Sequence, residues 1–104
     1  MSDLYDDGDT AVMDRDEVDI QEPRDFAVCI LNDDYSTMEL VVSLLKDLFH
    51  KTAEEAERLM MDVHTKGSCV AGIYTLDIAQ TKQMQAMSIA RKEGYPLKLE
   101  LREM

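Results

Sequence analysis

The sequence predicts an α+β fold with the element order β-α-α-β-α-β, a sandwich in which a three-stranded antiparallel sheet carries three helices on one face. Three observations support this prediction. Short apolar segments with strand-like alternation occur near residues 26, 69 and 97. Two helix-capping signals lie close together after the first of these segments. A longer segment with helical periodicity separates the second from the third.

The first strand and the first helix follow one another closely. Residues 26–31 are apolar at every position, which indicates a strand covered on at least one face. Ser36 and Glu39 form a capping box, which predicts that a helix begins there. This helix carries an apolar stripe on one side. The stripe consists of Met38, Val41, Val42, Leu45, Leu48 and Phe49.

The second helix begins at a further capping box, formed by Thr52 and Glu55. Gly67 suits the C-terminal end of this helix, because glycine readily adopts the left-handed conformation of a cap. Few residues separate the two helices, so we expect a tight helical hairpin. The apolar face of the second helix consists of Ala56, Leu59, Met60 and Val63.

The second half of the chain predicts a strand over residues 69–74, a third helix from about Leu76 to Glu93 and a last, half-buried strand. Thr75 is a good N-cap for the helix, and Gly94 and Pro96 close it. The apolar stripe of the third helix is Leu76, Ala79, Ala86, Met87 and Ala90. In the last strand Leu97, Leu99 and Leu101 alternate with Lys98, Glu100 and Arg102.

The charge distribution divides the chain into two parts. The 104 residues allow one small domain, and they carry 22 acidic against 11 basic side chains, a net charge of -11. Such a charge argues against nucleic acid or an anionic membrane surface as a partner. Ten of the acidic residues lie within residues 1–25. We therefore expect residues 1–24 to be an acidic disordered N-terminal extension and residues 25–104 to be the core domain.

The sequence shows no targeting signal, and its two cysteines lie in apolar segments, so we expect an intracellular soluble protein. We find neither a secretory signal nor an apolar run long enough to cross a membrane. Cys29 and Cys69 lie inside strand-like segments, where buried and reduced thiols are expected.

Asn32, Asp33 and Asp34 form a polar turn between the first strand and the first helix, and His64 lies near the end of the second helix. Because the first strand and the helical hairpin form one unit, the turn and His64 can meet. Such a cluster could be a metal site, a hydrolytic site or a binding pocket. A metal site is disfavoured because adjacent carboxylates rarely converge on one metal ion. A hydrolytic site is disfavoured because Ser36 is better explained as a helix cap than as a nucleophile.

The third kind of site is a pocket for a primary ammonium group beside an apolar side chain. An ammonium has three donors, and an Asn carbonyl, a carboxylate and a neutral His nitrogen supply three acceptors. Charge-assisted hydrogen bonds and apolar burial contribute favourable free energy, and association costs part of it. The difference corresponds to roughly micromolar affinity. The alternative for His64 taken alone is a core or boundary imidazole with one hydrogen bond. The expected apolar lining consists of Met38, Val41, Met60 and Val63.

Residues Phe26 to Glu103 resemble the ClpS family, the adaptors of bacterial and plastid Clp proteases that recognise N-degrons. The resemblance lies in several motifs in the right order. They are Asn32-Asp33-Asp34-Tyr35, Met38-Glu39, Met60-x-x-Val63-His64, Gly72-x-Tyr74-Thr75, Ala79-x-Thr81-Lys82, Ala90-Arg91 and Pro96-Leu97. The resemblance implies a core related to the C-terminal domain of the ribosomal stalk protein. It also implies an adaptor that is not an enzyme and uses no cofactor or metal.

The resemblance further implies roles for individual residues. Asn32 and His64 would bind the α-amino group of a substrate protein, and Asp33 and Asp34 would complete that site, partly through water. Met38 would be the gate that excludes β-branched first residues. A pocket for Leu, Phe, Tyr or Trp would be shaped by Ser36, Val41, Met60, Val63 and Leu97. Docking on the N-terminal domain of the unfoldase ClpA or ClpC would use Asp77, Thr81 and Lys82.

The family also implies a monomer in the bacterial cytoplasm or a plastid, whose N-terminal extension helps to hand substrate over. The other interpretation of the chain is a stalk-like protein-docking module without an amine pocket. The sequence departs from the family's usual residues at a few positions. Thr37 replaces proline, Leu40 replaces phenylalanine, Gln80 replaces an acid, and Arg102-Glu103 replaces Glu-Lys.

Overall fold

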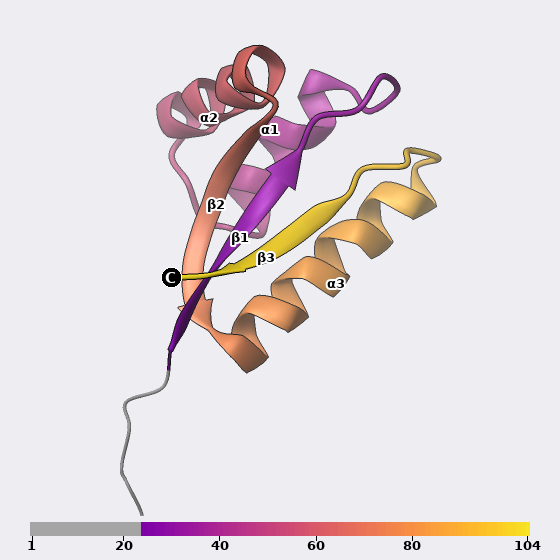
Figure 1. Ribbon diagram of the computed structural model, residues 1–104. Coiled ribbons are helices and arrows are strands. Elements are labelled where there is room, and N and C mark those ends of the chain that lie inside the picture. The colour runs from indigo at the N-terminus through magenta and orange to yellow at the C-terminus, as the bar shows by residue number, and fades with distance from the viewer. Residues whose placement is uncertain (1–23) are drawn as a thin grey trace, which may run out of the picture.

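The computed structural model describes residues 24–104, which form three strands and three helices (Figure 1). The predicted β-α-α-β-α-β order is confirmed. The elements are β1 Asp25–Leu31, α1 Met38–Asp47, α2 Ala53–Lys66, β2 Ser68–Thr75, α3 Leu76–Lys92 and β3 Leu99–Glu103. The predicted N-terminal extension, apart from Arg24, lies outside the described residues. Within residues 24–104 no helix combines the length and the apolar character that a membrane span requires.

The strands of the described region form one antiparallel sheet with the order β2-β1-β3, so β1 lies in the centre. Asp25 pairs with Thr75 and Leu31 with Ser68, and the end of β1 is therefore beside the start of β2. Val28 pairs with Gly72 whereas Cys29 pairs with Val70, so β2 carries a bulge at Ala71. The bulge lets β2 keep apolar side chains toward the core on both sides of the irregularity.

The helices cover one face of the sheet. Val28 and Ile30 of β1 are fully buried in a core shared with all the helices, as Leu45, Val63 and Ala86 illustrate. Alternation along the strand directs Ala27 and Cys29 to the other face. In Figure 1 the α1–α2 hairpin stands at one end of the sheet, and α3 runs alongside β3. The predicted arrangement of helices on one face is thus confirmed.

The start of α1 differs from the prediction by one residue. Thr37, not Ser36, is the N-cap, and its hydroxyl accepts a hydrogen bond of 3.1 Å from the Leu40 amide. The amide of Ser36 instead donates to Asp33, so Ser36 belongs to the preceding turn. The predicted capping box was wrong because Ser36 and Thr37 are neighbouring hydroxyl residues that can both cap a helix. The hydrogen bond from the Ser36 amide to Asp33 holds Ser36 in the turn and leaves Thr37 as the cap.

The other helix ends agree more closely with the sequence. The Thr52 hydroxyl accepts from the Glu55 amide at 3.2 Å, and Gly67 caps α2 with φ of 94°. Thr75 occupies the N-cap position of α3, but its side chain makes no capping hydrogen bond. Only five residues separate α1 from α2, which confirms the tight hairpin.

Two predicted apolar positions lie elsewhere than expected. Leu76 is 40% exposed, so it was wrongly placed in the buried stripe of α3, which consists of alanines. Leu76 is the first residue of the helix, and the buried stripe begins only at Ala79. Leu97 is 3% exposed, but it precedes β3, which begins only at Leu99.

Candidate functional site

Two backbone hydrogen bonds hold the polar turn that follows β1. The Leu31 amide donates to the Lys98 carbonyl at 3.0 Å, and the Asn32 amide donates to the Gly67 carbonyl at 2.9 Å. Gly67 is the C-terminal cap of α2, and His64 lies in the last turn of that helix. Asn32 and His64 are far apart in the sequence, and the bond to Gly67 places them on the same side of the molecule.

Asp33 fixes the shape of the turn. One carboxylate oxygen, Oδ1, accepts hydrogen bonds from the amides of Tyr35 and Ser36, each at 2.7 Å. Burial of the carboxyl raises its pKa, but the hydrogen bonds from Ser36 and Tyr35 lower it more, so the Asp33 pKa is below its ordinary value. Asp33 Oδ2 and Ser36 Oγ are buried and have no partner within residues 24–104. The turn therefore holds an ionised carboxylate with one acceptor to spare.

A pocket of about 430 Å³ lies between this turn, the start of α1 and the last turns of α2. It is lined by Asn32, Asp33, Asp34, Ser36, Thr37, Met38, Val41, Met60, Val63 and His64. Nine of these ten residues are among those that the sequence and the family resemblance indicated. Thr37 was not predicted to line the pocket, although it is a second hydroxyl residue directly before the helix. Leu97 lies in the buried core and is not among the lining residues.

The pocket has a polar rim and an apolar floor. Asn32, Asp34 and His64 are exposed, whereas Val41 and Val63 are each only 4% exposed. The exposure of His64 rules out the interpretation of this residue as a core imidazole. Acceptors at the rim beside an apolar floor can hold a small cationic donor group and the apolar side chain attached to it.

Two methionines form part of the wall of the pocket. Met38 is 46% exposed, Met60 is half-buried, and both also line a neighbouring hollow between α1 and α2. Their flexible thioethers therefore separate two spaces on the surface of the hairpin. The size of the side chain that the pocket accepts depends on where these two side chains lie.

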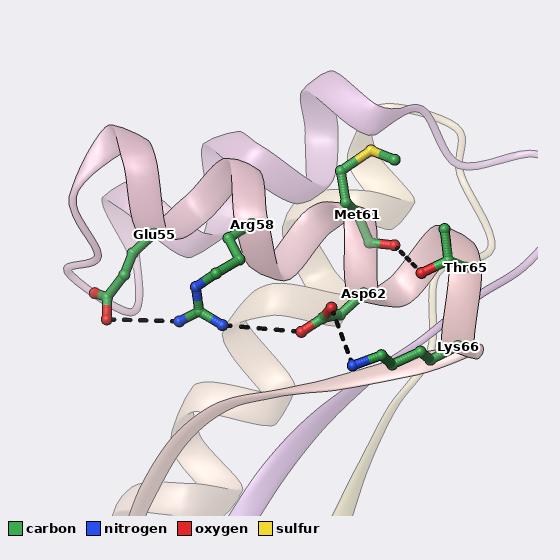
Figure 2. Close-up of polar contacts among 6 residues, drawn as sticks. All are labelled: Glu55, Arg58, Met61, Asp62, Thr65 and Lys66. Atoms are coloured by element: carbon green, nitrogen blue, oxygen red, sulfur yellow. Dashed lines mark hydrogen bonds and ion pairs between the residues drawn. The ribbon is translucent and has the colours of Figure 1, made fainter.

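The outer face of α2 has a different character (Figure 2). Arg58 lies 3.9 Å from Glu55 and 4.0 Å from Asp62, and Lys66 lies 3.6 Å from Asp62. The Thr65 hydroxyl donates to the Met61 carbonyl at 2.8 Å. Arg58, Glu55 and Lys66 are exposed and Asp62 is half-buried, and ion pairs at these helical spacings stabilise the helix slightly. Among the described residues, no group of three or more His, Cys, Asp or Glu side chains is arranged to hold a metal ion.

The three residues implied in docking lie on α3, away from the pocket. α3 begins where β2 ends, and β2 ends beside Asp25, at the opposite end of β1 from Asn32. The Thr81 hydroxyl donates to the Asp77 carbonyl at 3.0 Å. The Lys82 ammonium donates to the Leu48 carbonyl at 2.8 Å and lies 5.8 Å from the centre of the Tyr74 ring. Lys82 therefore also links α3 to the end of α1.

Comparison with known proteins identifies the family. The family model described as ATP-dependent Clp protease adaptor protein ClpS matches residues 21–100. An adapter protein ClpS of Nitratidesulfovibrio vulgaris strain Miyazaki F is 48% identical over 95 residues, which cover 91% of this chain and 93% of the relative. One from Deinococcus radiodurans is 46% identical over 92 residues, covering 88% and 80%.

A solved structure agrees with the sequence relatives. It is Agrobacterium tumefaciens ClpS2 bound to L-phenylalaninamide, which is 34% identical to this chain, with a TM-score of 0.77. The alignment covers 80% of this chain and 100% of that one. On the evidence of its fold, its motifs and these relatives, the chain belongs to the ClpS family of adaptor proteins of the ATP-dependent Clp protease.

Proposed function

We propose that this chain binds proteins through a free, bulky hydrophobic N-terminal residue and delivers them to the AAA+ unfoldase of the Clp protease for degradation. The accepted first residues are Leu, Phe, Tyr and Trp. The observation that carries the proposal is the pocket, in which exposed acceptors surround a buried apolar floor. The phenylalaninamide bound by the Agrobacterium relative has the same two parts, a free amine and an apolar side chain.

In this proposal Asn32 and His64 accept hydrogen bonds from the substrate ammonium, and Asp33 and Asp34 provide the opposing charge. The unpartnered Asp33 oxygen is buried, so the Asp33 carboxylate acts on the amine through its charge and through a bridging water. A blocked amine has lost its charge and two of its donors, so it no longer satisfies these acceptors. The apolar side chain of the first residue then packs against Val41 and Val63.

The delivery step uses a second surface. We assign docking on the N-terminal domain of ClpA or ClpC to Asp77, Thr81 and Lys82, by family resemblance. Because α3 begins at the opposite end of the sheet from the pocket, substrate and unfoldase can bind at the same time. Residues 1–24 serve as the tether that assists transfer. The protein acts as a cytoplasmic monomer without catalytic activity or cofactor, and its relatives are bacterial.

The test compares a fluorescent peptide that begins with Leu or Phe with its N-acetylated twin, by anisotropy. We expect the free amine to improve affinity by at least about tenfold, since one charge-assisted hydrogen bond contributes roughly 1.5–3 kcal/mol. Asn32→Ala and His64→Ala should each weaken the free peptide selectively. Met84→Ala, an exposed change on α3, is the control.

Equal affinity for both twins would contradict the amine pocket. If the twins bound with equal affinity and the chain still bound its Clp partner, the alternative of a stalk-like docking module without an amine pocket would be favoured. Turnover in an assay for hydrolysis would instead indicate an enzyme.

A further inference from the structure

A further hollow borders the same polar turn. Its volume is about 450 Å³, and its lining is Leu31, Asn32, Asp33, Asp34, Tyr35, Pro96 and Lys98. Three of these residues, Asn32, Asp33 and Asp34, also line the amine pocket. The two hollows therefore meet at the residues that would bind a substrate's α-amino group.

The wall of this hollow contains an unusually placed aromatic ring. Tyr35 is 73% exposed, although its backbone is held by the hydrogen bond of its amide to Asp33. Tyr side chains usually bury most of their ring surface. A ring that is anchored at its backbone and open to solvent provides a ready contact surface, because little conformational entropy is lost when a partner covers it.

The geometry of a peptide chain decides which hollow the second substrate residue can reach. Successive Cα atoms are about 3.8 Å apart, and the amine is bonded directly to the first Cα. The second residue therefore lies close to the residues that bind the amine. The hollow between α1 and α2 shares with the amine pocket only Met38 and Met60, and none of the residues that would bind the amine lines it. The hollow beside Tyr35 is the one within reach.

We infer that the hollow formed by Tyr35, Pro96 and Lys98 receives the side chain of the substrate's second residue and favours an apolar or aromatic one. This inference rests on the proposed function. The lining carries two negative charges, on Asp33 and Asp34, and one positive charge, on Lys98. A bound substrate ammonium would add a second positive charge, so the charges around the hollow then balance. A charged second side chain therefore gains little, whereas an apolar one is covered by Tyr35, Pro96 and Leu31.

The experiment uses two peptides, Leu-Phe and Leu-Gly, that are identical from the third residue on, each with its N-acetylated twin. We expect the wild-type chain to bind Leu-Phe about five times more tightly than Leu-Gly, as partial burial of one aromatic side chain allows. Tyr35→Ala should reduce this ratio to about one and leave Leu-Gly affinity unchanged. This substitution keeps the amide that bonds to Asp33. Tyr35→Phe should preserve the ratio, and so should the control Met84→Ala.

Each failure has its own signature. If Leu-Gly binds no better than its acetylated twin, the proposed function has failed and the inference fails with it. If Leu-Gly binds well but Leu-Phe gains nothing, or if Tyr35→Ala leaves the ratio intact, only the second-residue site is overturned. Thermal unfolding of Tyr35→Ala checks that the fold is kept.

Discussion

Asp33 and Asp34 are adjacent and carry the same functional group, but the fold gives them different surroundings. Asp33 is half-buried, and its carboxylate accepts hydrogen bonds from two backbone amides, which stabilises the conformation of the turn. Asp34 is exposed at the rim of the pocket. The backbone amide of Asn32 donates a hydrogen bond to the Gly67 carbonyl, and the Asn32 side chain lies at the rim of the pocket. Single residues of this turn therefore have separable effects on stability and on binding.

The first prediction concerns Asp33→Ala. Loss of two amide hydrogen bonds to a carboxylate should lower the free energy of unfolding by about 1–3 kcal/mol near neutral pH. The Asp33 pKa is below its ordinary value of 3.8, so this contribution is present above that value and is lost as the pH falls through the lower folded-state pKa. Urea unfolding at pH 7 and at pH 2–3 measures the difference. The gap between wild type and variant should shrink in acid, and an equal gap at both pH values would refute the role. Asp34→Ala is the control.

The second prediction concerns Met38→Ala. Met38 forms part of the pocket wall and is 46% exposed, so its truncation should enlarge the pocket without a large loss of stability. Peptides that begin with Ile or Val should then gain about tenfold in affinity relative to Leu, as expected for relief of a clash with one branch methyl group. Met61→Ala removes a methionine of similar exposure from the same hairpin but outside the pocket, and it should change nothing. If Ile peptides still fail to bind Met38→Ala, Met38 is not the gate.

At the scale of elements, β2 contains a glycine whose identity depends on the packing of a neighbouring side chain. Its bulge brings both Gly72 and Tyr74 to the inner face, and the Tyr74 ring lies over the glycine. The same ring packs against Phe49, with centroids 6.5 Å apart, at the end of the first helix. Gly72 is therefore required by a close approach of a side chain, whereas Gly67 is required by its backbone conformation with φ of 94°.

The third prediction uses this difference. A Cβ at Gly72 would lie 2.5 Å from the Tyr74 hydroxyl oxygen, so Gly72→Ala should destabilise the protein by about 1–3 kcal/mol through displacement of the ring. In a Tyr74→Ala background the same substitution should cost almost nothing. Gly67→Ala should cost about 1 kcal/mol in either background, because its strain is in the backbone. Denaturant unfolding of the double-mutant cycle measures these couplings. A cost of Gly72→Ala that persists without Tyr74 would exclude the ring as its cause.

Across the whole molecule, one contact joins the hairpin that carries the pocket to α3, the helix that we propose for unfoldase docking. The Lys82 ammonium donates to the Leu48 carbonyl, next to the last residue of α1, and α1 begins at the pocket. A cation at the C-terminal end of a helix is favourable for the helix dipole as well as for the orphan carbonyl. The residue that the family resemblance assigns to unfoldase docking thus also supports the hairpin that carries the pocket.

The fourth prediction follows from this double role. Lys82→Ala should lower the free energy of unfolding by about 1 kcal/mol, which corresponds to roughly 4–8 °C in melting temperature for a domain of this size. Lys92→Ala, at an exposed position in the last turn of the same helix, should have little effect. Calorimetry compares the two. Equal melting temperatures for Lys82→Ala and wild type would show that the contact does not support the fold. Docking assays should therefore begin with the exposed Asp77 and Thr81.

Much of the fold was predictable because its signals are local. Helix caps, glycines and the two periodicities act within a few residues, and they predicted the element order and the tight hairpin correctly. The errors occurred where a local pattern had two solutions or where burial depends on a distant partner. Thr37 and Ser36 both fit as caps, and Leu76 fits the spacing of the α3 stripe although the stripe is buried only from Ala79 onward.

The sequence by itself determined the kinds of residue at the candidate site and, through the hairpin, that the turn and His64 can meet. Only the tertiary structure decided how they meet, because the hydrogen bond between Asn32 and Gly67 joins segments that are separated by two helices. It also decided that Leu97 lies in the core, that Lys82 bonds to Leu48, and that Tyr35 faces a second hollow. These features depend on packing between elements distant in sequence, which no local pattern encodes.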